Sequence, residues 1–106
     1  MKKIIISFVF GFCVFASANA EKQCELTEQA LYYEMSKTSP ETIEDHVRVA
    51  RIYRAMANRG CPTNSAMFKE YSRASLDAAR SLVYIEGYTG REKARYDGMI
   101  KSASGY

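Results

Sequence analysis

The sequence predicts an all-α domain, and three observations support this fold class. Strand signals are weak, since no run of alternating β-branched residues appears and no Asn-Gly or Asp-Gly turn separates two such runs. Capping residues, prolines and glycines divide the chain into segments whose apolar residues recur with the helical period. Cys24 and Cys61 flank two of these segments. We therefore expect three to four helices, the first two forming an antiparallel hairpin closed by one disulfide.

Residues 1–20 have the composition of a secretory signal peptide. A basic start, Met1-Lys2-Lys3, precedes an apolar run over 4–15, and Ala18-Asn19-Ala20 is a small-x-small cleavage site. The apolar run is too short to span a bilayer. We expect cleavage before Glu21 and export through the general pathway into a bacterial periplasm, which is an oxidising compartment.

Removal of this segment changes the charge and the size of the chain. Of the 106 residues, 86 remain, enough for one domain over 21–106 near the lower size limit of a self-supporting core. The net charge of +3 loses Lys2 and Lys3 and becomes +1, so the composition favours no nucleic-acid partner. Residues 21–45 carry net −5 and residues 46–106 carry net +6, an asymmetry that either holds the two halves together or steers a charged partner.

The first two helices are expected over about 23–37 and from Ser39-Pro40-Glu41 to about Arg59. Ser39 is suited to the N-cap, and Pro40 to the first helical position. Gly60 is expected to end the second helix in a left-handed conformation. Apolar residues at helical spacing predict the buried faces, with Leu26, Ala30 and Tyr33 in the first helix and Ile43, Val47, Ala50, Tyr53 and Ala57 in the second.

A third helix is expected over about 65–86, followed by a short fourth. The sequence from Thr89 to Glu92 has the spacing of a capping box. Gly98 inside the fourth helix costs about 1 kcal/mol relative to alanine. The predicted inner faces are Phe68, Tyr71, Ser75, Ala78, Leu82 and Ile85 in the third helix and Tyr96, Met99, Ile100 and Ala103 in the fourth.

The two cysteines of the mature chain are expected to form a disulfide. A short connection makes the first two helices antiparallel, so the start of one and the end of the other lie at the same end. Cys24 and Cys61 occupy these positions, and an even cysteine count in an oxidising compartment indicates a bridge. The loop from Cys24 to Cys61 has 38 residues, for which chain entropy predicts about 4 kcal/mol of stabilisation.

The sequence contains no convincing catalytic or metal-binding constellation. His46 is the only histidine and lacks a second ligand at helical spacing. Glu41, Glu44 and Asp45 lie in the first turns of a helix, where acids stabilise the helix dipole. The two cysteines do not form the C-x-x-C motif of redox catalysts. We expect neither an enzyme nor a bound cofactor or metal.

Three arginines are the candidate partner-binding residues. Arg48, Arg51 and Arg54 recur every third residue along the second helix, with Tyr53 between the last two. This spacing makes an oblique basic band, suited to carboxylates or lipid headgroups. The alternative is that the band is merely a solvated helix face.

The layout is similar in architecture to periplasmic acid-stress chaperones and to some exported immunity proteins, and no residue roles carry over from that resemblance. We expect a protein-binding module of the cell envelope, such as an accessory of a secretion or conjugation machine or an immunity or inhibitor protein. Its partner would be another envelope or secreted protein. A stress chaperone of the holdase type and a membrane-active or toxic periplasmic factor are the alternatives. A membrane surface is less favoured as a partner, and self-association stays open.

Overall fold

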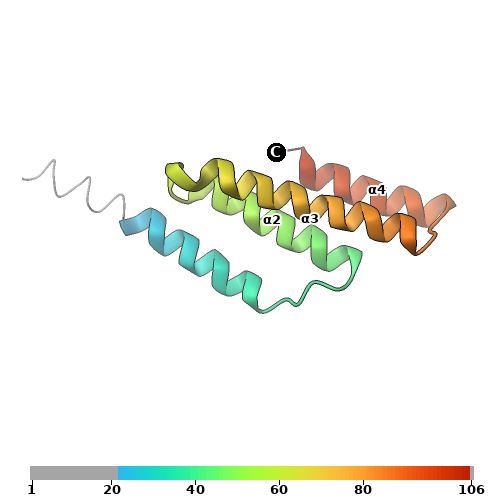
Figure 1. Cartoon of the computed structure of the whole chain (residues 1–106), viewed down its shortest axis with the longest axis horizontal. Coiled ribbons are helices and arrows are strands. Elements are labelled where there is room, and N and C mark those ends of the chain that lie inside the picture. The colour runs from blue at the N-terminus through green and yellow to red at the C-terminus, as the bar shows by residue number, and fades with distance from the viewer. Residues whose placement is uncertain (1–21, 106) are drawn as a thin grey trace, which may run out of the picture.

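The structure, a computed structural model, describes residues 22–105, so the predicted signal peptide lies outside the described residues. Within this range the chain is helical and contains no strand, which confirms the all-α fold class. None of these helices is long and apolar enough to cross a bilayer. The elements are an N-terminal helix (22–36), α2 (Ile43–Arg59), the 3-10 helix η1 (Pro62–Asn64), α3 (Ser65–Ile85) and α4 (Gly90–Ser104) (Figure 1).

The antiparallel pair α2 and α3 forms the centre of the bundle. The N-terminal helix lies beside α2, and α4 lies beside α3, each antiparallel to the helix next to it in sequence (Figure 1). The Ser72 hydroxyl donates a buried hydrogen bond of 2.8 Å to the Ala50 carbonyl, so the two central helices touch through small residues. Gly87, in the left-handed conformation at φ 71°, makes the turn after α3.

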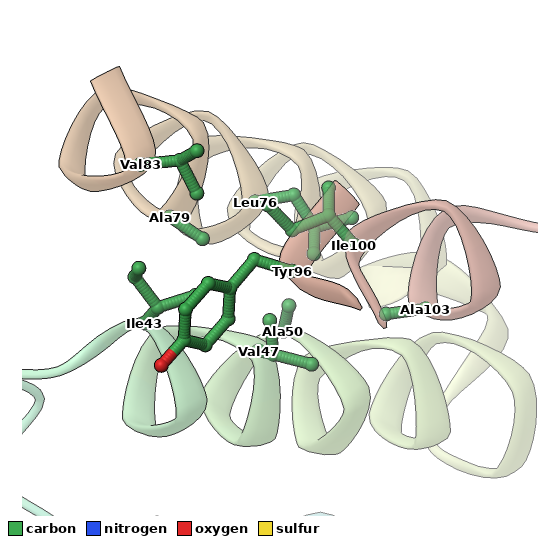
Figure 2. Packing of buried hydrophobic residues seen from close by; sticks show 9 residues of the cluster. All are labelled: Ile43, Val47, Ala50, Leu76, Ala79, Val83, Tyr96, Ile100 and Ala103. Carbon is green, nitrogen blue, oxygen red and sulfur yellow. The ribbon is translucent and has the colours of Figure 1, made fainter. Parts of the chain in front are cut away.

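The main core lies where α2, α3 and α4 meet (Figure 2). A second, smaller core at the other end of the central pair consists of Met56, Ala57 and Phe68. Leu31, Ile52 and Tyr53 pack against it, so the N-terminal helix covers this second core. The main core comprises Ile43, Val47, Ala50, Leu76, Ala79, Val83, Tyr96, Ile100 and Ala103.

The buried face of α3 differs from the predicted one by a rotation of about one residue. Tyr71 and Ile85 were expected inside, but Ile85 is 73% exposed and Tyr71 is 42% exposed. Two adjoining stripes on this helix both have helical spacing, and packing against α2 and α4 selects the one with the better fit. The buried residues are Phe68, Ser72, Leu76, Ala79 and Val83.

The prediction for the N-terminal helix was also wrong. Leu26 and Tyr33 are 48% and 65% exposed, whereas Glu28 and Leu31 face the bundle. The disulfide explains this rotation, because Cys24 must face Cys61. Glu28 and Leu31, four and seven positions after Cys24, lie on the same helix face as Cys24.

The first turns of α2 and α4 differ from their predicted caps. Thr42 rather than Ser39 is the N-cap of α2, and it forms a reciprocal capping box with Asp45. Pro40 therefore lies in the preceding connection. Thr89 is the N-cap of α4 as predicted, but its side chain makes no capping bond.

Candidate binding site

A basic groove lies between α2 and the carboxyl end of α4. We call it the arginine groove and define it by Arg51, Arg54 and Arg59, which line it on the α2 side. Its volume is about 310 Å³. Ala55, Asn58 and Ala103 complete the lining.

The guanidinium groups of this groove lack carboxylate partners within residues 22–105. Of the eight arginines in the chain, Arg48, Arg73, Arg80 and Arg95 have a carboxylate within 4.0 Å. Three of the remaining four are those of the arginine groove. Their charge is not neutralised by the fold, so the groove attracts anionic groups.

Arg54 also has a structural role. Its Nη2 donates a hydrogen bond of 3.3 Å to the Ser104 carbonyl and so satisfies an acceptor in the last turn of α4. Its Nε is buried without an acceptor among the described residues. Arg54 also lines a second groove of about 300 Å³ along α3, which contains Arg73, Arg80 and Asp77. Arg73 and Arg80 are paired there with Glu70 and Asp77, so this second groove is largely neutralised.

The structure separates the residues predicted to bind a partner. Arg51 and Arg54 share the arginine groove, but Arg48 points to Glu34 of the N-terminal helix, with 4.0 Å between Nη2 and Oε2. Tyr53 packs against Phe68 on another face of α2. Because an α-helix turns by about 100° per residue, each arginine in this series is rotated by about 60° from the previous one. Arg48 is therefore rotated by about 120° from Arg54 and lies outside the arginine groove.

Aromatic rings gather around Phe68 at the seam between the N-terminal helix, α2 and α3. The Phe68 ring centroid lies 6.0 Å from Tyr32 and 6.3 Å from Tyr53. Tyr53 in turn lies 5.3 Å from Tyr71. Burial, followed by the neighbouring phenols of Tyr32 and Tyr71, raises the pKa of Tyr53 above 10.0. Tyr32 and Tyr71 stay partly exposed, so this cluster reaches the surface.

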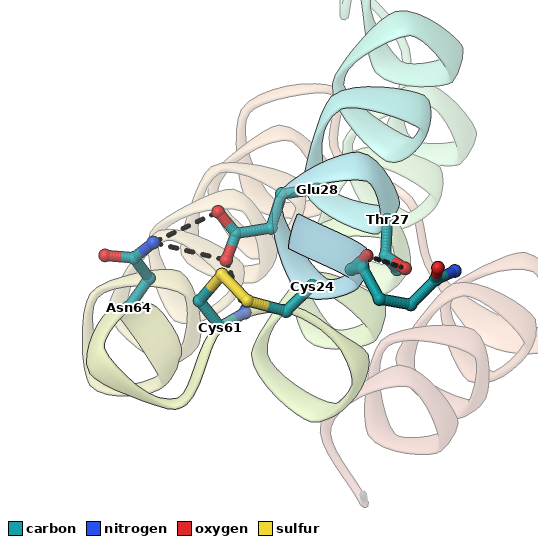
Figure 3. The surroundings of a disulfide bond; sticks show 6 residues. Cys24, Thr27, Glu28, Cys61 and Asn64 are labelled. Carbon is teal, nitrogen blue, oxygen red and sulfur yellow. Dashed lines mark hydrogen bonds between the residues drawn. A yellow bond between two sulfur atoms is a disulfide. The ribbon is translucent and has the colours of Figure 1, made fainter. Parts of the chain in front are cut away.

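The predicted disulfide is present and is accompanied by a buried carboxylate (Figure 3). Cys24 and Cys61 are joined with 4.9 Å between their Cα atoms. Glu28, one turn after Cys24, accepts the Cys61 N–H at 2.6 Å. The Asn64 side-chain amide donates to both Glu28 oxygens, at 3.0 and 3.2 Å. These groups, which we call the clasp, hold the N-terminal helix to the start of α3.

Sequence reasoning missed Glu28 and gave the wrong reason for Gly60. Gly60 is extended at φ −80°, not left-handed. Glycine is required there because a Cβ would lie 2.5 Å from the Met56 carbonyl oxygen and 2.7 Å from Glu28 Cγ. The spacing of four between Cys24 and Glu28 was the available signal, since it places both on one helix face.

No family model, curated protein or solved structure matches this chain. The fold and the sites define a class, which is a small helical bundle with a disulfide clasp and a basic surface groove.

Proposed function

We propose that this protein is an exported protein-binding module that holds an acidic segment of another envelope or secreted protein in the arginine groove. The observation that carries the proposal is the absence of carboxylate partners at Arg51, Arg54 and Arg59 within the described chain. An accessory of an envelope machine and an immunity or inhibitor protein are both roles of this kind. The disulfide is compatible with export into a periplasm.

The chemistry of the groove favours carboxylates. Guanidinium groups form paired hydrogen bonds with carboxylates, and such charge-assisted bonds are stronger than neutral ones. Arg54 is held in place by its bond to Ser104, so part of the cost of ordering it is already met. Asn58 adds an amide to the same groove.

The shape of the groove favours a protein over a membrane surface. The arginines line a hollow about 310 Å³ in volume, which suits projecting side chains of a partner. Binding to an anionic lipid surface typically uses a cluster of about four to eight basic residues, whereas Arg51, Arg54 and Arg59 are the basic residues that line this groove.

Site-specific crosslinking tests this proposal directly. A photo-crosslinking amino acid in place of Asn58 should give one dominant protein adduct in the cells that make this protein. The same amino acid in place of Ala94, an exposed position on α4, is the matched control and should not give that adduct. Many adducts at Asn58 would indicate a holdase chaperone, and lipid adducts alone would indicate a membrane-active factor.

Charge substitution provides the quantitative test. R51Q combined with R59Q should weaken binding of the crosslinked partner by about tenfold or more and reduce its salt dependence. Arg54 is left unchanged because it supports α4. R91Q combined with K93Q removes the same charge from exposed positions of α4 and should leave affinity nearly unchanged. Equal losses in both double variants would show that net charge, rather than the groove, governs binding.

A further inference from the structure

The N-terminal helix is attached to the bundle differently from the other helices. Among residues 22–36 the only buried residue is a carboxylate, Glu28, at 9% exposure. The main core contains no residue of this helix and is completed by α2, α3 and α4 alone. The main core of those three helices is therefore complete without apolar contacts from residues 22–36.

Beneath this helix lies an apolar surface formed by α2 and α3. Met56, Ala57 and Phe68 are buried there, with Ile52 and Tyr53 beside them. From the N-terminal helix, Leu31 packs onto this cluster and Tyr32 meets the Phe68 ring edge-on. Residues 22–36 cover this apolar surface, which we call the groove beneath the N-terminal helix.

One end of this groove presents hydrogen-bond donors to a carboxylate. The Cys61 N–H and the Asn64 amide both donate to Glu28, at the amino end of η1 and α3 (Figure 3). The positive end of a helix dipole strengthens this preference for negative charge. The groove thus recognises a helix that carries a carboxylate and, three residues later, an aliphatic side chain, as Glu28 and Leu31 do.

We propose that the groove beneath the N-terminal helix is a second binding site, for an amphipathic partner helix with this carboxylate and aliphatic pair, and that the disulfide controls access to it. A dithiol reductant would transfer two electrons and two protons to the Cys24–Cys61 bond, giving two thiols and the disulfide of the reductant. The site uses another face of α2 from the arginine groove and does not rest on the proposed function.

The contacts that remain after reduction are few. Glu28 would still bind Cys61 and Asn64, and Leu31 would still contact the second core. At the far end of the helix the ion pair between Glu34 and Arg48 is long and exposed, and contributes little. The disulfide fixes the start of the N-terminal helix against the bundle, whereas after reduction only the connection through residues 37–42 tethers it. A partner helix then competes with a helix that is tethered at one end and no longer locked at both.

Hydrogen exchange tests whether reduction releases the helix. Amides in residues 22–36 should exchange at least about tenfold faster after treatment with dithiothreitol than in the oxidised protein. Amides of the main core in α2, α3 and α4 should stay better protected than those of residues 22–36, even where loss of the disulfide lowers global stability. Unchanged protection of residues 22–36 would overturn the proposal, and so would an equal loss of protection in residues 22–36 and in the main core.

A peptide in trans tests whether the groove binds a helix. The probe is a fluorescent peptide of residues 22–36 carrying C24S, and the receptor is the full chain with C24S, E28A and L31A, which weaken its own helix. Under reducing conditions the peptide should bind this receptor, and an E28A peptide should bind about tenfold more weakly. An E25A peptide changes an exposed acid and should bind like the parent.

The oxidised wild-type protein provides the last comparison, because its groove is already occupied. It should not bind the peptide. Equal binding of the parent and E28A peptides would overturn the proposed recognition, and binding to the oxidised protein would overturn the control of access by the disulfide.

Discussion

At Gly60 the reason for glycine is space rather than backbone freedom. The Met56 carbonyl and the Glu28 side chain leave no room for a Cβ. Gly98, in the middle of α4, has no neighbour within 4 Å of a Cβ and does not adopt a positive φ. The two glycines therefore make a matched pair in which one is required by packing and the other only lowers helix stability.

Alanine substitutions at these glycines should have opposite effects. G60A should lower the free energy of unfolding by about 1–3 kcal/mol, because Glu28 or the end of α2 must shift. G98A should raise it by about 0.5–1 kcal/mol, because alanine favours the helix. Urea denaturation of both oxidised variants measures the effect. A stabilised G60A variant would contradict the close packing between Gly60 and Glu28.

At the scale of a helix, the capping box of α2 links stability to pH. The Asp45 N–H donates to Thr42 Oγ1 at 3.1 Å, and the Thr42 N–H returns a bond to the Asp45 carboxylate at 3.3 Å. A further bond comes from the Glu41 N–H. These backbone donors, Glu41 first, hold the pKa of Asp45 below its usual 3.8.

Acid should therefore weaken the start of α2. Since the folded pKa of Asp45 is depressed, the stability that it contributes is present above about pH 4 and is lost as the pH falls through the folded pKa. Urea unfolding of the wild type and of D45N, from pH 5 downward, measures this. The difference in stability between them should shrink as the pH falls. A difference independent of pH would show that the carboxylate charge has no role in the cap.

At the scale of the whole molecule, the disulfide lies at one end of a bundle that has two unequal cores. The main core of α2, α3 and α4 is built from nine buried residues, whereas the second core has three. The clasp stands at the end with the smaller core, where apolar burial alone offers less stabilisation.

Removal of both cysteines should destabilise the protein without changing its helical class. C24S combined with C61S should lower the free energy of unfolding by up to about 4 kcal/mol, the entropy of closing the loop in the unfolded chain. Circular dichroism should retain the signal of α2, α3 and α4, and thermal melting should occur at a lower temperature. An unchanged melting temperature would show that the clasp does not contribute to global stability.

Local sequence signals were enough for the helical segments and for the disulfide. Proline, glycine and capping residues act within a few positions, so the breaks near Pro40, Gly60 and Gly87 could be located from neighbouring residues alone. The pairing of Cys24 with Cys61 followed from the short connection between two antiparallel helices. The buried faces of α2 and α4 were largely predictable, because each carries one dominant apolar stripe.

Only the tertiary structure decided how the N-terminal helix and α3 are rotated, and hence where the binding surfaces lie. Leu26 and Tyr33 form an apolar stripe as regular as the buried one, yet the disulfide turns them outward. The burial of Glu28 depends on donors from Cys61 and Asn64, more than thirty positions away in sequence. The arginine groove likewise depends on the end of α4 reaching Arg54. Helical periodicity is a property of one segment, whereas the choice between two stripes is made by the free energy of packing against the others.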